Sequence, residues 1–211
     1  GGNWDYPEAS YARRKEIWEA HKKYAQGLFY FLLTDKRVSK VVKDNMDQLG
    51  FCKDEFVDSG HWPPQLYVRE ARRMRGEYVF TEHDIRVHNL NKPDVIAMGS
   101  HGIETHYVRR YINDRGFVKN EGFKRTGERR FQIPFKSLIP KKGEVENLVV
   151  PVCVSATEVG YSAIRMEPTY MLLAHAAGLA ASKIVDEHKG VHELDVSEIQ
   201  KKLLEQGQIL H

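Results

Sequence analysis

Residues 147–185 read NLVVPVCVSATEVGYSAIRMEPTYMLLAHAAGLAASKIV, and this stretch decides the fold of the chain. The apolar run 148–154 predicts a buried strand, in which Cys153 would be a small buried residue. A short polar stretch, 155–162, leads from this strand into a helix. Small residues in that helix predict close approach to another backbone; they are Ala174, Ala176, Ala177, Gly178, Ala180 and Ala181.

The first turn of this helix is a candidate ligand site. Pro168 suits that turn, because its missing N–H costs no hydrogen bond there. A helix N-terminus carries about half a positive charge and several unpaired N–H groups. With Arg165 and Glu167 beside it, the helix start is expected to attract an electron-rich ligand.

Four segments support a family resemblance when they are taken together and in order. They are LYVREARRMRGEYVFTEHDI (66–85), IPFKSLIPK (133–141), NLVVPVCVSAT (147–157) and GYSAIRMEPTYMLLAHAAGLAA (160–181). The chain resembles the C-terminal part of bacterial FAD-dependent oxidoreductases of the glutathione-reductase-like superfamily. Some members of that family carry the label xanthan lyase, so the resemblance implies redox chemistry and a link to carbohydrate metabolism.

The resemblance also implies a missing part. Family members bind the ADP half of FAD through G-x-G-x-x-G in an N-terminal Rossmann domain, and this chain contains no such motif. We therefore expect a C-terminal fragment of a longer flavoprotein, with the Rossmann FAD domain largely absent and acting as a partner. FAD is expected in the intact protein and none bound to this chain alone, because one helix end contributes far less than micromolar binding requires.

Composition bounds the remaining classes. With 211 residues, 41% hydrophobic and 29% charged, the chain has the make-up of a soluble globular protein of one or two domains. A net charge of +3 argues against a nucleic-acid binder, and no apolar run is long enough for a membrane span. Two cysteines without a C-x-x-C motif favour neither a disulfide framework nor a metal site. A bacterial cytoplasmic and an exported location both stay open.

Periodicity predicts an α+β fold, a mainly antiparallel sheet flanked by N-terminal and C-terminal helices. Residues 3–34 form an amphipathic helix whose apolar face, with Ile17 and Leu28, suits core packing better than partner binding. A second helix, 38–49, ends at Gly50, and a turn-rich break follows at 58–64. A last amphipathic helix covers 195–206, with Val196, Ile199 and Leu203 inward.

Between these helices the pattern predicts short strands at 65–74, 77–81, 95–100, 105–112, 129–134 and 148–154. Residues 116–130 are expected to form a long exposed hairpin, and Thr81 to cap a helical turn at 82–84. The resulting division is 1–62 helical, 63–146 an antiparallel-sheet substrate-type domain, and 147–211 a strand plus flavin-capping helices.

The resemblance places the flavin at the start of the long helix, with Arg165 nearest. The implied cofactor-binding residues are Ser162, Ile164, Arg165, Met166, Glu167 and Pro168. The flavin N1 and C2=O become electron-rich on reduction, and a helix N-terminus stabilises that charge. The competing interpretation is a packed helix with an Arg165–Glu167 ion pair.

Two further groups are candidate substrate and catalytic residues. Arg69 and Arg73 lie on one face of a predicted strand and could hold an anionic substrate bidentately, and Trp62 could line the cleft. His101 or His106 could accept the hydroxyl proton of an alcohol during its oxidation, with Glu104 orienting the ring. An ion-paired sheet face, a hinge tryptophan and a surface turn are the structural alternatives.

We therefore expect the substrate-side and flavin-capping portion of an FAD-dependent oxidoreductase that acts on a small organic or carbohydrate-derived substrate. A non-catalytic domain that binds carbohydrate or a partner protein is one alternative, and a polysaccharide lyase is another. No metal site is expected.

Overall fold

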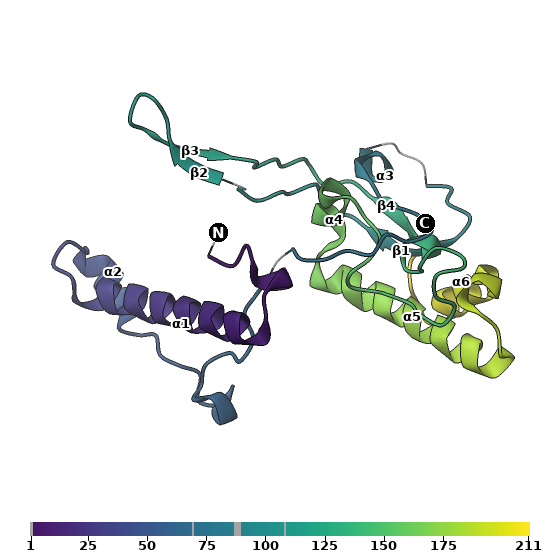
Figure 1. Ribbon diagram of the computed structural model, residues 1–211, viewed down its shortest axis with the longest axis horizontal. Coiled ribbons are helices and arrows are strands. Elements are labelled where there is room, and N and C mark those ends of the chain that lie inside the picture. The colour runs from purple at the N-terminus through teal and green to yellow at the C-terminus, as the bar shows by residue number, and fades with distance from the viewer. Residues whose placement is uncertain (1, 69, 87–89, 108) are drawn as a thin grey trace. The chain divides into compact units, whose positions relative to one another are not determined.

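The computed structural model describes residues 2–68, 70–86, 90–107 and 109–211. The chain divides into two compact units, Gly1–Ala71 and Arg72–His211 (Figure 1). The three-part division predicted from the sequence stays a prediction.

The first unit is helical. A short 3-10 turn, η1 (Tyr6–Glu8), precedes the long helix α1 (Tyr11–Thr34), which begins at its N-cap Ser10, whose side chain accepts a hydrogen bond from the Arg13 N–H. The shorter helix α2 (Lys40–Met46) packs against α1, and η2 (Val57–Ser59) lies in the turn-rich segment.

The apolar face predicted for the first helix is only partly covered. Ile17 is buried, whereas Leu28 is 45% exposed. The helix starts at residue 11 rather than 3, because Ser10 supplies the N-cap. The second helix ends at Met46 rather than Leu49, so Gly50 does not terminate it.

The second unit contains two separate antiparallel pairs of strands. β1 (Val95–Gly99) pairs with β4 (Phe131–Pro134), which continues into η3 (Phe135–Ser137). β2 (Arg109–Ile112) pairs with β3 (Val118–Glu121), so the hairpin spans 109–121 rather than the predicted 116–130. The fold is therefore mixed helix and antiparallel strand, as expected, but one continuous sheet is replaced by two small ones.

Within the described residues, several other segments that were predicted as strands have an irregular backbone instead. Residues 148–154 form no strand, and Cys153 is exposed rather than buried. Pro151 interrupts this run and cannot donate to a ladder, and single backbone bonds replace one, such as Val150 N–H to the Leu138 carbonyl at 2.7 Å. Residues 77–81 make only an isolated bridge, Phe80 with Ala156, and the described part of 65–74 forms no strand.

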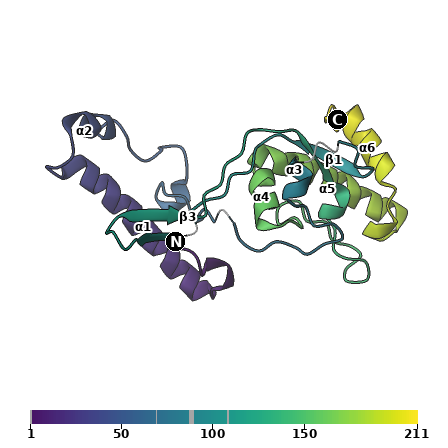
Figure 2. The same ribbon diagram turned by 90° about the horizontal axis from the view of Figure 1, so that it is seen from above.

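Helices cover the β1–β4 pair and form the core with it. α5 (Glu167–Glu187) packs on β1, and α6 (Val196–Glu205) packs on both α5 and β1, as Figure 2 lets the reader follow. A 3-10 turn, η4 (Val191–Glu193), joins the two helices. Ile199 and Leu203 of α6 are fully buried, which confirms the inward face predicted for this helix.

The small residues of α5 divide between two faces. Ala176, Ala177 and Ala180 are buried on the face that also carries Leu173. Ala174, Gly178 and Ala181 are exposed, and a Cβ at Gly178 would meet nothing within 4 Å. The prediction that Gly178 packs closely against another element is wrong, because it lies on the solvent side of the helix.

Glutamine side chains complete the backbone hydrogen bonds of β1. Gln208 Nε2 donates to the Ile96 carbonyl, and Gln200 Nε2 donates to the Val95 carbonyl at 3.0 Å. Gln132 Nε2 in turn donates to the Leu210 carbonyl at 2.9 Å. The C-terminal segment is thereby attached to the strand edge, and buried carbonyl groups there are satisfied.

Candidate functional site

The candidate cofactor segment is a junction between two helices. α4 (Glu158–Ile164) begins at Thr157, whose Oγ1 accepts from the Gly160 N–H at 3.1 Å, and Arg165 is its C-cap. α5 starts two residues later with Met166 as N-cap and Pro168 in the first turn. The stretch 155–162 was expected to be a polar linker, but its second half is helical because Thr157 supplies a strong N-cap.

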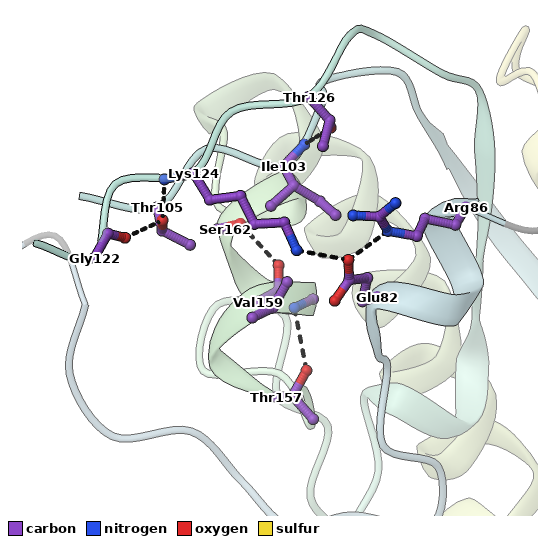
Figure 3. Close-up of polar contacts among 11 residues, drawn as sticks. Glu82, Arg86, Ile103, Thr105, Gly122, Lys124, Thr126, Thr157, Val159 and Ser162 are labelled. Carbon is purple, nitrogen blue, oxygen red and sulfur yellow. Dashed lines mark hydrogen bonds and ion pairs between the residues drawn. The ribbon is translucent and has the colours of Figure 1, made fainter. Parts of the chain in front are cut away.

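Ser162 does not lie at the start of the long helix, where the sequence analysis placed it. Ser162 lies inside α4, is fully buried, and donates from Oγ to the Val159 carbonyl at 2.7 Å (Figure 3). Ile164 is also fully buried. At the start of α5 itself, Met166 is half-buried and Glu167 and Pro168 are exposed. Of the six predicted cofactor residues, these last three and Arg165 form the helix start.

Arg165 connects this junction to the predicted catalytic loop. Its residue is 6% exposed, and Nη2 donates to the Glu104 carbonyl at 2.8 Å. Arg165 is buried rather than exposed to solvent, because the 101–106 loop lies against it. The structure thus brings together two groups of candidate residues that are about 60 positions apart in the sequence.

The start of α5 has no side-chain cap. Met166 supplies no hydrogen bond to the first turn, and Pro168 has no N–H to offer. The Tyr170 N–H is the first to bond within the helix, to the Met166 carbonyl at 3.0 Å. In a helix of 21 residues this end carries the positive end of the macrodipole, which favours an electron-rich group.

The segment 122–126, which follows β3, holds the 101–106 loop in place. Backbone bonds join Thr105 N–H to the Lys124 carbonyl and Thr126 N–H to the Ile103 carbonyl, both at 2.9 Å. Figure 3 shows the side-chain bonds of Thr105 to the Gly122 carbonyl and of Thr126 to the Ile103 N–H. At Gly102 a Cβ would lie 2.4 Å from the Thr126 carbonyl oxygen, so this close approach requires glycine.

The predicted catalytic side chains have separate environments. His101 is half-buried, and its Nδ1 lies 2.7 Å from the Gly102 carbonyl, so this nitrogen carries the proton in that contact. The Glu104 carboxylate lies 3.5 Å from Arg125 Nε, and its backbone carbonyl faces Arg165. His106 is half-buried. The orienting role that we expected for Glu104 stays a prediction.

The three predicted substrate residues fall in different parts of the structure. Arg69 lies outside the described residues. Arg73 belongs to the second unit, where its Nε donates to the Ala156 carbonyl at 3.2 Å and its guanidinium lies 5.5 Å from the centre of the Tyr161 ring. Trp62 belongs to the first unit and packs edge-on against Phe51, with ring centres 5.7 Å apart.

Two tyrosines at the junction were missed from the sequence. The Tyr161 and Tyr170 hydroxyl groups are 2.6 Å apart, and Tyr161 also donates to the Val152 carbonyl at 3.2 Å. Burial, followed by the hydrogen bond to Tyr161, raises the pKa of Tyr170, so the phenol stays neutral. These residues come from successive helices, and nothing in their spacing indicates that their side chains meet.

Two kinds of site are not found. Within residues 2–68, 70–86, 90–107 and 109–211, no group of three or more His, Cys, Asp or Glu side chains is placed to hold a metal ion. None of the helices in the described part of the chain has the length and apolar character needed to cross a bilayer.

The fold and the junction define a mixed helix-and-strand protein with a helix start suited to an electron-rich ligand. The chain belongs to the FAD dependent oxidoreductase family, whose family model matches residues 2–203. No curated protein and no solved structure matches the chain. Family membership supports the redox class, whereas the glutathione-reductase-like assignment and the xanthan lyase label stay expectations.

The junction fits the flavin that the family implies. A side-chain cap would occupy the N–H groups at the start of α5, and none is present. The buried Arg165 guanidinium adds a fixed positive charge at the same place. Met166, Glu167 and the first turn of α5 would hold the electron-rich edge of the ring, and Arg165 would lie close to it. FAD, when bound, supplies the hydride-accepting ring.

Proposed function

We propose that this chain forms the flavin-capping and substrate-facing portion of an FAD-dependent oxidoreductase. The observation that carries the proposal is the hydrogen bond from the buried Arg165 to the Glu104 carbonyl. It holds the candidate cofactor segment and the candidate catalytic loop together. Alcohol oxidation requires this proximity, because the flavin takes the hydride from the substrate carbon while a base takes the proton from the hydroxyl on that carbon.

The residues have distinct roles in this proposal. The start of α5 and Arg165 stabilise negative charge on the ring. His101 or His106 accepts the hydroxyl proton, and Glu104 positions the loop through its carbonyl bond to Arg165. Arg73, and Arg69 by its place in the sequence, bind an anionic substrate group. The substrate is a small organic or carbohydrate-derived molecule, and a Rossmann domain supplies the pyrophosphate site.

The role of Arg165 is tested in a protein that contains this chain together with an FAD-binding domain. Arg165→Gln removes one fixed charge worth about 1–2 kcal/mol in a partly buried site. For a two-electron couple, in which 1.4 kcal/mol is about 30 mV, the reduction potential falls by about 20–40 mV. Arg165→Lys keeps the charge and the potential stays near wild type. Arg75→Gln, at an exposed position, is the control for a general effect of charge.

Measurements of flavin content and melting temperature separate a fall in the reduction potential of Arg165→Gln from misfolding of the variant. If Arg165→Gln folds and retains flavin with an unchanged potential, the proposed placement of the ring is wrong. Titration of FAD into the chain alone, followed by flavin fluorescence, tests whether the pyrophosphate site lies in a separate Rossmann domain. We expect no saturable binding at micromolar concentration, and saturation there would mean that the chain contains the pyrophosphate site as well.

A binding role remains an alternative because of one feature of the first unit. A groove of about 530 Å³ lies between α1 and α2 and is mainly apolar. Its lining includes Phe29, Leu33 and Phe51, which are 44%, 37% and 56% exposed. Retained flavin binding and turnover in a protein with Phe29→Ser and Phe51→Ser would show that this groove is not part of the reaction site.

A further inference from the structure

The ribbon of β2 and β3 has an open edge. In the described residues β3 pairs with β2 alone (Figure 1). All four residues of β3 are exposed. A two-stranded ribbon is marginally stable in water without further strands or packing. An open edge also presents a row of backbone N–H and C=O groups to any other strand.

The register identifies which groups face outward. Arg110 stands opposite Asn120, and Ile112 stands opposite Val118. At the turn the Asn113 N–H bonds to the Phe117 carbonyl at 3.0 Å. Hydrogen-bonded and non-bonded rungs alternate in an antiparallel ladder, so the Val118 and Asn120 rungs are non-bonded. The backbone N–H and C=O of Asn120 therefore point away from β2.

The charges on β3 are complementary to a second β3 strand. Lys119 and Glu121 flank Asn120. If two β3 strands pair antiparallel about a two-fold axis at Asn120, Lys119 of each lies opposite Glu121 of the other copy. Opposite charges facing each other across strands stabilise a pair. The β2 edge has no such complement, because two-fold pairing of β2 about Arg110 would place the Arg110 cations of the two copies opposite each other.

We propose that β3 joins two copies of this chain into a symmetric dimer. The two ribbons form one four-stranded antiparallel sheet, ordered β2, β3, β3 of the second copy and β2 of the second copy. The Asn120 residues of the two copies exchange backbone hydrogen bonds at the two-fold axis. Such a contact is isologous, so it closes after two copies. Pairing β2 of one copy with β3 of the next would instead be heterologous and would build an open-ended chain of copies. This inference does not depend on the proposed oxidoreductase activity.

The dimer is expected to be weak and concentration-dependent. The strands are only four residues long, so the contact is well below the area of a stable interface. Val118 is 62% exposed on the same face as Asn120, and the Val118 of each copy extends the contact on its own side of the axis. A test must therefore capture a dimer that forms transiently.

A disulfide trap provides that test in the full chain. The exposed Cys52 and Cys153 are first replaced by serine. In the proposed register the two Asn120 Cα atoms lie about 5.5 Å apart, within disulfide range. Val118 residues lie two positions from the axis in each copy and are more than about 10 Å apart. Asn120→Cys should form a cross-linked dimer on mild oxidation, and Val118→Cys, at an equally exposed position, should not.

Equal cross-linking at the two positions, or none at Asn120→Cys up to about 1 mM protein, would overturn the proposal. Sedimentation velocity then tests the backbone contact without cysteines. Asn120→Pro removes an outward N–H that β2 does not use, so the ribbon stays folded while the dimer is lost. Asn120→Ser keeps the N–H and should still dimerise. A dimer that persists in Asn120→Pro with unchanged circular dichroism assigns the contact to another surface and refutes the role of β3.

Discussion

Asp84→Ala removes the centre of a nearly buried polar network in the second unit. The Asp84 carboxylate, 5% exposed, accepts hydrogen bonds from the Tyr78 hydroxyl, from Lys92 Nζ at 2.6 Å and from the Thr81 N–H at 2.7 Å. These bonds attach α3 (Glu82–Arg86) to the segment that leads into β1. The substitution leaves Lys92, whose side chain is 14% exposed, without its carboxylate.

The magnitude follows from the burial of the pair. Breaking a buried ion pair by removing one partner costs about 3–5 kcal/mol. Because Lys92 retains some access to water, we expect the lower end, about 3 kcal/mol, and a fall in melting temperature of roughly 10 °C for a unit of this size. Glu205→Ala is the matched control. It removes an ion pair to Lys202 whose side chains are 47% and 61% exposed, and such pairs contribute about 0–1 kcal/mol.

The pH dependence gives a second measurement on the same residue. Burial by itself raises the pKa of Asp84, but the hydrogen bonds from Lys92, Tyr78 and Thr81 outweigh it and hold the pKa below its ordinary value of 3.8. A group with a lowered pKa stabilises the fold above its unfolded pKa, and this stability is lost as pH falls through the folded pKa. The stability advantage of wild type over Asp84→Asn should therefore be full at pH 6 and shrink below about pH 4.

Urea unfolding of the three variants, followed by circular dichroism, measures both effects. The reasoning fails if Asp84→Ala costs no more than Glu205→Ala. It also fails if the difference between wild type and Asp84→Asn is the same at pH 6 and pH 3.

Three further predictions follow from the packing of the second unit. Gly178→Ala should stabilise the chain by up to about 1 kcal/mol, because an exposed helix interior favours alanine and the added Cβ meets open space; a lower melting temperature would contradict this. Gln208→Ala should cost about 1–3 kcal/mol in urea unfolding, because the buried Ile96 carbonyl loses its donor, whereas Gln206→Ala nearby should cost less. Cys153 should react with a thiol reagent in the native state as fast as Cys52, since both are exposed; slower labelling of Cys52→Ser, which retains Cys153, than of Cys153→Ser would contradict this.

Local sequence signals determined the elements that have strong caps and clear periodicity. Pro168 marked the first turn of α5. The spacing of Ile199 and Leu203 gave the buried face of α6, and Thr81 precedes α3 as predicted. These features depend on residues within one or two turns of each other, so the sequence contains the whole cause.

The sequence could not decide which apolar runs pair as strands. Residues 95–99, 131–134 and 148–150 are all mainly apolar, but only the first two segments form a ladder. Pairing depends on partners that are distant along the chain, and Pro151 excluded one run from donating a regular series of bonds. The exposure of Gly178 and Cys153 followed from which face of each segment met the β1–β4 core.

The candidate site shows the same division. The residue types and the family resemblance drew attention to Arg165 and to the 101–106 loop separately. Their hydrogen bond, and the contact between Tyr161 and Tyr170, required the chain to fold back on itself. Chemistry-bearing residues can be recognised one by one from a sequence. Their distances are set by the packing of α4 and α5 and the 101–106 loop, which is a property of the tertiary structure alone.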